Sequence, residues 1–358
     1  MAKIKEFLKR KDIVFSPKRY GIDALGAMAQ GLFCSLLVGT IVKTLGQQLA
    51  LQFLIDVGDF ASAMSGAAMA VAIGYALKAP ALVLFSLATV GYAANSLGGA
   101  GGPLAVLIIA IAAAECGKAV SKETKVDILV TPLTTILVGV GLAALIAAPI
   151  GAAAAAVGNF IKWATDLQPF LMGIIVSVTV GIALTLPISS AAICAALGLT
   201  GLAGGAAVAG CCAHMVGFAV MSFRENRWGG LVAQGIGTSM LQMPNLVKNP
   251  RCWLPPVITS AITGPIATCI FKLQMNGAPV SSGMGTCGLV GQIGVVTGWF
   301  TPSDAAILSG AAPITPGAMD WLGLILICFV LPAVLTWLIA IPFRRSGWIK
   351  EGDLKLDM

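Results

Sequence analysis

The feature that most constrains this chain is residues 167–223, a stretch that contains no Asp, Glu, Lys or Arg. As one α-helix it would be roughly 85 Å long at about 1.5 Å per residue, whereas the hydrocarbon core of a bilayer is about 30 Å thick. The stretch must therefore turn back at least once. Other runs of the same kind cover residues 79–114, 128–161, 273–303 and 321–343.

The composition agrees with these runs. Only 10% of the residues are charged, 58% are hydrophobic, and the mean hydropathy is +0.93. A soluble domain carries about a quarter charged residues. We therefore expect an all-α polytopic membrane protein.

Basic residues indicate the topology. The start, MAKIKEFLKRKDIVF, lacks a long apolar core and a cleavage site, so it is not a signal peptide. It is either an amphipathic segment on an anionic leaflet or a solvated basic tail. Lysines in the loop ECGKAVSKETKVD and basic residues at both ends predict, by the positive-inside rule, that both termini are cytoplasmic. The charge is not gathered on a soluble domain, which argues against nucleic-acid binding.

The chain offers little for metal or redox chemistry. It has nine cysteines without C-x-x-C spacing and one histidine. A single histidine excludes a metal site with several histidine ligands, and the cysteine spacing argues against a disulfide framework or a zinc site. We expect no metal, no cofactor and no catalytic residue of its own.

The two halves of the sequence differ in how continuous their apolar runs are. In the first half we expect spans at 21–42, 60–77, 79–97 and 103–115, a longer span within 128–157, and an extracellular segment at 159–166. The second half is broken by Gly, Pro and uncharged polar residues, as in LTLPISSAAI and PVSSGMGTCGLVGQ. Broken helices at membrane depth occur only where protein or a wet cavity satisfies the backbone. This half is predicted to contain re-entrant hairpins and a polar site.

Residues 283–288, GMGTCG, have the glycine spacing of a dinucleotide-binding turn. That motif requires a preceding strand, whereas MNGAPVSS is turn material, and no G-x-x-x-x-G-K-[ST] loop occurs. GIGTS at 235–239 and GMGTC at 283–287 share G-x-G-T, and paired Gly-interrupted segments point to a transporter's binding region. We expect both to form tight intramembrane turns beside a ligand.

Two ionisable positions are candidates for the site. His214 lies in an apolar run, where it either bonds a neighbouring carbonyl or serves a substrate or a proton. Glu225, the sole acid between 167 and 303, sits with Asn226 in FRENRWGG, which is either an interfacial loop or a cavity wall. Asp56 and Asp59 mark an interfacial segment or, alternatively, a proton pathway.

Uncharged polar residues complete the predicted site. Amides and hydroxyls without net charge suit a neutral polyhydroxylated ligand such as a sugar, although some of them are expected only to join helices. The predicted substrate-binding residues are His214, Glu225, Asn226, Gln234, Thr238, Ser239, Gln242, Asn245, Ser281, Ser282, Thr286 and Gln292.

Several stretches carry a family resemblance. KVDILVTPLTTILVG, PFLMGIIVSVTVGIALTLPISSAAI, AHMVGFAVMSFRENRWGGLVAQGIGTSMLQMPNLVKNP and GMGTCGLVGQ occur in order. Together they resemble the IIC membrane components of the bacterial phosphotransferase system, in particular the branch of the perfringolysin O regulator proteins. The resemblance implies an inner-membrane homodimer of about ten transmembrane helices, with two re-entrant hairpins around a sugar site in the C-terminal half. It also implies phosphorylation of the sugar by a separate IIB protein.

One departure concerns the acid in the sugar site. Sugar-transporting relatives carry a glutamate in a G-I-T-E-P-like motif, whereas this chain has only PITPG and FTPSD, so Glu225 is the sole acid available for that role.

The expected organisation follows from these patterns and the resemblance. It comprises a basic cytoplasmic segment at 1–19, a dimerisation domain at 20–166, a transport domain at 167–343 and a cytoplasmic tail at 344–358. The leading hypothesis is a permease for a neutral sugar. The alternatives are a membrane sensor of the same fold and a proton-coupled secondary transporter.

Overall fold

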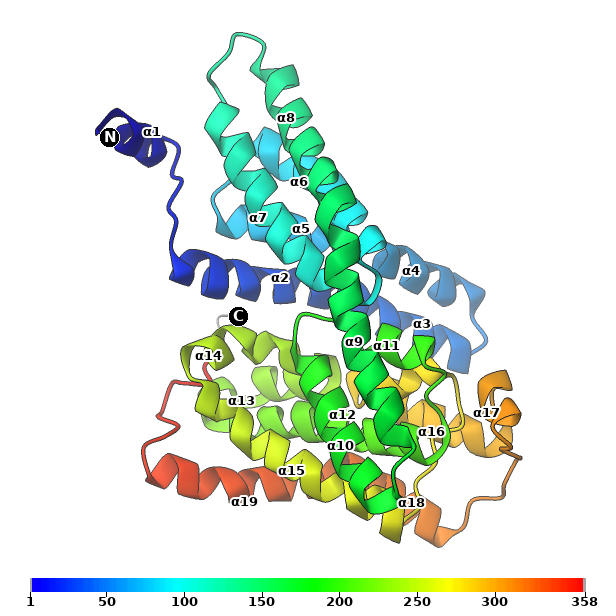
Figure 1. Cartoon of the computed structure of the whole chain (residues 1–358). Helices are drawn as coiled ribbons and strands as arrows, with labels where there is room; N and C mark the ends of the chain where they lie inside the picture. Colours follow the sequence, from blue (N-terminus) through cyan, green and yellow to red (C-terminus); the bar gives the residue numbers. More distant parts are fainter. Residues whose placement is uncertain (1, 357–358) are drawn as a thin grey trace. The chain divides into compact units, whose positions relative to one another are not determined.

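The computed structural model describes residues 2–356, with side chains described from residue 5 onward, and it is helical (Figure 1). Within that range there is no strand, only an isolated antiparallel bridge between Gly201 and Met275. Six stretches of helix are long and apolar enough to cross a membrane, and a bent pair raises the number to seven. The six are Arg19–Gln48, Ala81–Val120, Asp127–Thr165, Gly201–Met221, Pro250–Ile270 and Ala318–Arg345. The protein is therefore a multi-pass membrane protein.

The chain divides into two compact units, Met1–Ala153 and Ala154–Met358. The boundary falls inside α9 (Ala148–Thr165), a helix that also contains most of the segment expected outside the cell. The helices of the first unit are α1 (Ala2–Arg10), α2 (Ala24–Leu32), α3 (Val38–Gln48), α4 (Gln52–Ala63), α5 (Ser65–Ala76), α6 (Ala81–Gly98), α7 (Gly102–Val120) and α8 (Asp127–Leu142).

Small residues allow close helix packing in the first unit. A Cβ added at Gly91 of α6 would lie 2.1 Å from the carbonyl oxygen of Gly66 in α5, so only glycine permits this crossing. The pair α4 and α5 is bent by 49°. Helices α6 and α7 run antiparallel, because Gly117 near the end of α7 faces Val83 near the start of α6.

The basic N-terminal segment is anchored to the first unit. Arg10 pairs with Glu123 at 2.7 Å, and Lys11 contacts the same carboxylate. Arg19 Nη2 donates to Asp12 Oδ2 at 2.7 Å, and this bond holds the pKa of the Asp12 carboxyl below its ordinary value. At least these side chains are bound to protein rather than free in solvent.

The second unit is built around α12 (Gly201–Met221), which packs against α10, α15 and α19. Its other helices are α10 (Pro169–Thr185), α11 (Ser190–Ala196), α13 (Phe223–Val232), α14 (Met243–Lys248), α15 (Leu254–Pro265), α16 (Val290–Phe300), α17 (Asp304–Leu308), α18 (Ala318–Ile325) and α19 (Leu331–Arg345). A Cβ at Gly210 would lie 1.9 Å from the Ser177 carbonyl oxygen, so α10 touches the backbone of α12. In the 18-residue window that qualifies α12 as a span, 89% of the residues are buried, which makes α12 the core helix of this unit.

Two short segments flank α12. Helix α11 has 7 residues and is roughly 10 Å long, too short to cross a bilayer. The Ser189 hydroxyl caps it by accepting from Ala192 N at 3.2 Å. The second segment is a series of tight turns over residues 279–289. The two segments meet where Ser190 Oγ donates to Gly283 O at 2.7 Å.

Candidate functional site

A buried hydroxyl–imidazole cluster lies against the middle of α12. Thr185 Oγ1, at the end of α10, lies 3.0 Å from His214 Nδ1 and 2.7 Å from Ser239 Oγ. All three residues are fully buried. No charged side chain of residues 5–356 forms an ion pair with this cluster, and the Thr185 hydroxyl holds the imidazole by a hydrogen bond.

The other nitrogen of His214 is free. Nε2 has no hydrogen-bond partner among residues 2–356 although the residue is fully buried. The ring makes edge-to-face contacts with Phe218 and Trp253, at centroid distances of 6.0 and 5.9 Å. A buried polar atom without a partner is costly, and it is an available contact for a ligand group.

The two G-x-G-T segments lie next to each other. The first comprises η5 (Ala233–Gly237) and the residues after it, and the second ends in η10 (Cys287–Leu289); η5 and η10 are in contact. Thr238 Oγ1 accepts from Met240 N at 3.1 Å and so caps the turn after η5. Gly285 adopts a φ of +55°, where a side chain is strained, and it approaches Cys211 of α12.

The second segment is bonded to α12 and to the loop that precedes it. Thr286 Oγ1 lies 3.6 Å from Met215 Sδ, and Ser282 Oγ donates to Leu199 O at 2.6 Å. Ser281 is buried and packs against Gly294 of α16. Gln292 Nε2 lies 3.3 Å from Cys212 Sγ, whereas its Oε1 has no partner among the described residues. Among the described residues, an unpartnered acceptor, Gln292 Oε1, thus lies beside α12, and an unpartnered imidazole nitrogen belongs to α12 itself.

The segment before GMGTCG does not have the structure that a dinucleotide-binding turn requires. It is the helical turn η9 (Pro279–Gly283) and not a strand. A dinucleotide-binding turn requires a strand at that place. The described residues also contain no group of three or more His, Cys, Asp or Glu side chains placed to hold a metal ion.

The amides of the first G-x-G-T region form a chain of hydrogen bonds. Gln242 Nε2 donates to Gln234 Oε1 at 2.8 Å, and Asn245 Nδ2 donates to Gln242 Oε1 at 2.9 Å. Gln234 Nε2 continues the chain to Ser222 Oγ at 2.9 Å. These side chains are buried and uncharged.

This amide chain binds the C-terminal segment, residues 346–356. Gln242 Nε2 and Asn226 Nδ2 both donate to Leu354 O, at 3.0 and 2.8 Å, and Asn226 Oδ1 accepts from Leu356 N at 2.8 Å. Asn245 Nδ2 donates to Lys355 O at 2.8 Å. These amides therefore have protein partners in this structure.

Glu225 is engaged in an ion pair. Its Oε1 accepts from Arg344 Nη2 at 2.9 Å, and its side chain is only 3% exposed. The same arginine nitrogen donates to Met221 O at 2.9 Å. Arg344 thus ties the end of α19 to the junction of α12 and α13.

The predicted residues fall into two groups. One group is distributed along α12: His214, Ser239, Ser281, Ser282, Thr286 and Gln292. Glu225, Asn226, Gln234, Gln242 and Asn245 form the other, which lies at the C-terminal segment, and Thr238 caps the turn between the groups. Both groups belong to the second unit.

Sequence reasoning missed three residues of this arrangement. Thr185 lies in a run that predicts an apolar helix, Trp253 belongs to no motif, and Arg344 indicates only the membrane topology. A hydroxyl directly before LPISS, where the helix breaks, was the available signal for Thr185.

In the first unit, Asp56 and Asp59 lie on exposed faces. Asp59 Oδ1 accepts from Lys43 Nζ at 2.6 Å, and Asp56 accepts from Gln52 at 2.8 Å. Both carboxylates have a local partner.

The helices and their apolar lengths define a polytopic membrane protein, and its second unit contains a buried uncharged polar cluster. The family model described as "Phosphotransferase system, EIIC" matches residues 22–356. The chain belongs to this family and is a membrane component of phosphotransferase type. In general, such a component takes a sugar substrate and works with a IIB partner. No curated protein and no solved structure matches the chain significantly.

Proposed function

We propose that this chain is a permease that carries a neutral sugar across the bacterial inner membrane while a separate IIB protein phosphorylates the sugar. The observation that carries the proposal is the match to the EIIC family over residues 22–356, together with the uncharged polar cluster beside α12. A neutral sugar needs donors and acceptors and no counter-charge, which suits this cluster.

His214 and Gln292 supply the first contacts in this proposal. If Nδ1 accepts a hydrogen bond from the Thr185 hydroxyl, Nε2 carries the ring proton and is a donor; in the other tautomer Nε2 is an acceptor. A sugar hydroxyl both donates and accepts, so it pairs with either tautomer. Gln292 Oε1, which has no partner among the described residues, would accept from a sugar hydroxyl at the face of α12 that carries Cys212.

The remaining predicted residues would act around this centre. The two G-x-G-T turns bring Thr238, Ser239 and Thr286 close to α12, where backbone and hydroxyl groups would line the path of the sugar. Ser281, Ser282 and Gln234 would hold the turns in place. Glu225, Asn226, Gln242 and Asn245 would reach the substrate only after the C-terminal segment moves.

The proposal extends to architecture. Short helix α11 and the turns over residues 279–289 support two re-entrant hairpins, and the family resemblance implies about ten transmembrane helices. We assign residues 20–166 to dimerisation and 167–343 to transport, with both termini in the cytoplasm.

A sensor of the same fold, as in the perfringolysin O regulator branch, is the second candidate. Two observations favour it. The C-terminal segment accepts hydrogen bonds from several predicted substrate residues, such as Gln242 and Asn245. The sequence also has no G-I-T-E-P-like motif with its glutamate. Such a sensor would bind the sugar without moving it.

Uptake into proteoliposomes tests these functions. Full-length protein is reconstituted and incubated with a panel of labelled neutral sugars, with and without a phosphorylated IIB protein. Sugar phosphate that accumulates inside only with phosphorylated IIB supports the permease. Binding without flux supports the sensor, and gradient-driven entry of unmodified sugar supports the proton-coupled alternative with Asp56, Asp59 or Glu225.

A further inference from the structure

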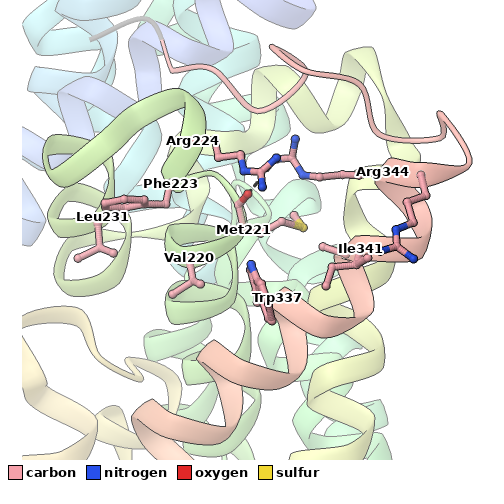
Figure 2. A pocket seen from close by; sticks show the side chains of 10 residues that line it. Val220, Met221, Phe223, Arg224, Leu231, Trp337, Ile341 and Arg344 are labelled. Carbon is pink, nitrogen blue, oxygen red and sulfur yellow. Dashed lines mark hydrogen bonds between the residues drawn. The ribbon is translucent and has the colours of Figure 1, made fainter.

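A cavity of about 580 Å³ lies in the second unit where α12, α13 and α19 meet. One part of its lining is basic and the rest is apolar. The apolar part comprises Val220, Met221, Phe223, Leu231, Trp337, Ala340 and Ile341, and the basic part comprises Arg224, Arg344 and Arg345. Figure 2 shows the guanidinium ends of Arg224 and Arg344 on the same side of the cavity, above Val220 and Trp337.

The basic part has unsatisfied positive charge. Arg344 is paired with Glu225, the only acid on the helices that line the cavity. The side chains of Arg224 and Arg345 are exposed and have no ion pair or hydrogen bond with any residue in the described range. Two guanidinium groups therefore face a cavity without a counter-ion from the protein.

The apolar part lies where a membrane span ends. The uncharged run 321–343 finishes at Arg344, so the arginines stand at the level where the hydrocarbon core gives way to headgroups. Trp337 of α19 and Trp228 of α13 are 51% and 71% exposed, as is common for tryptophan at a membrane interface. The cavity thus joins an acyl-chain environment to a cationic rim.

We infer that this cavity binds an anionic phospholipid, with the phosphate against Arg224 and Arg345 and an acyl chain along Trp337 and Ile341. Basic pockets between membrane helices bind the headgroups of anionic lipids. A free sugar phosphate fits less well, because its hydroxyls would face an apolar wall without partners. The lipid would connect α13 to α19 beside the Glu225–Arg344 pair, independently of the sugar site.

The test uses full-length protein in detergent, titrated with dioleoyl-phosphatidylglycerol or dioleoyl-phosphatidylcholine and followed by native mass spectrometry. The double variant Arg224→Gln/Arg345→Gln removes the unpaired charges and leaves the Glu225–Arg344 pair intact. The double variant Lys248→Gln/Lys350→Gln removes the same charge from exposed sites outside the cavity. Thermal unfolding of each variant checks that it is folded.

Wild type should retain phosphatidylglycerol in preference to phosphatidylcholine. The arginine variant should bind phosphatidylglycerol roughly thirtyfold more weakly, because each basic side chain near an anionic headgroup contributes about a fivefold gain. The lysine variant should bind like wild type. Equal binding by the arginine variant would overturn the inference, and so would displacement of the lipid by inorganic phosphate at similar concentration, which would identify a plain anion site.

Discussion

Replacing Thr185 by Val removes the hydroxyl at the centre of the buried cluster and keeps the shape of the side chain. Two groups then lose their partner, His214 Nδ1 at 3.0 Å and Ser239 Oγ at 2.7 Å. A buried polar group left unsatisfied costs about 1–3 kcal/mol, so the two together cost roughly 2–6 kcal/mol in the free energy of unfolding. Threonine and valine are both β-branched, so the substitution changes the helix propensity at position 185 little.

Chemical unfolding of the detergent-solubilised protein measures this difference. Thr336→Val is the matched control, because its hydroxyl bonds Thr259 Oγ1 at 2.9 Å and Thr259 keeps a second bond to Pro255 O. The control should lose only about 1 kcal/mol. Thr185→Ser should restore most of the stability and, in proteoliposomes, the sugar flux. The account of the cluster is refuted if Thr185→Val is no less stable than Thr336→Val.

Three further predictions concern other contacts. Arg344→Gln leaves the buried Glu225 carboxylate without its cation and should cost about 3–5 kcal/mol of unfolding free energy, part of which Glu225→Gln should restore. Asn226→Ala removes the two hydrogen bonds that Asn226 makes to the C-terminal segment. At about 1 kcal/mol each, their loss should make the detached segment roughly thirtyfold more populated, so trypsin should cleave it roughly thirtyfold faster. Arg19 lowers the pKa of Asp12, so the pair should stabilise the protein fully above the ordinary value of 3.8 and lose this effect as pH falls through the lower folded value.

Each of these predictions has a contradicting result. Equal stability of Arg344→Gln and wild type would mean that the Glu225 pair contributes nothing. Unchanged tryptic cleavage in Asn226→Ala would mean that the C-terminal segment is not held by that amide. For Asp12, the stability difference between wild type and Asp12→Asn should shrink on acidification below pH 3.8, and a constant difference would exclude the linkage.

The membrane class and the helical fold could be predicted because they depend on long uncharged runs. A stretch such as 167–223 cannot be accommodated in water or as one helix, whatever its neighbours are. The pairing of the two G-x-G-T segments is also visible in the sequence, because the same local pattern occurs twice. Their contact in space agrees with that pattern.

The partners of the polar residues could not be predicted. Asn226 and Asn245 look like ligand-binding amides, but they bond a backbone segment more than a hundred positions away. An extended backbone offers the same donors and acceptors as a sugar, so residue type alone does not separate the two. Likewise, the position of Arg344 directly after an uncharged run indicates only a membrane boundary, and tertiary packing alone brings it to Glu225.

The central claim is that a neutral sugar binds in the cluster beside α12. A cryo-EM structure of the full-length protein with a sugar identified by the uptake assay tests it most directly. The account predicts density against His214 Nε2, on the side of α12 where Thr185 and Ser239 lie. Sugar density elsewhere in the protein, with His214 still enclosed by Phe218 and Trp253 and no ligand beside it, would contradict the account.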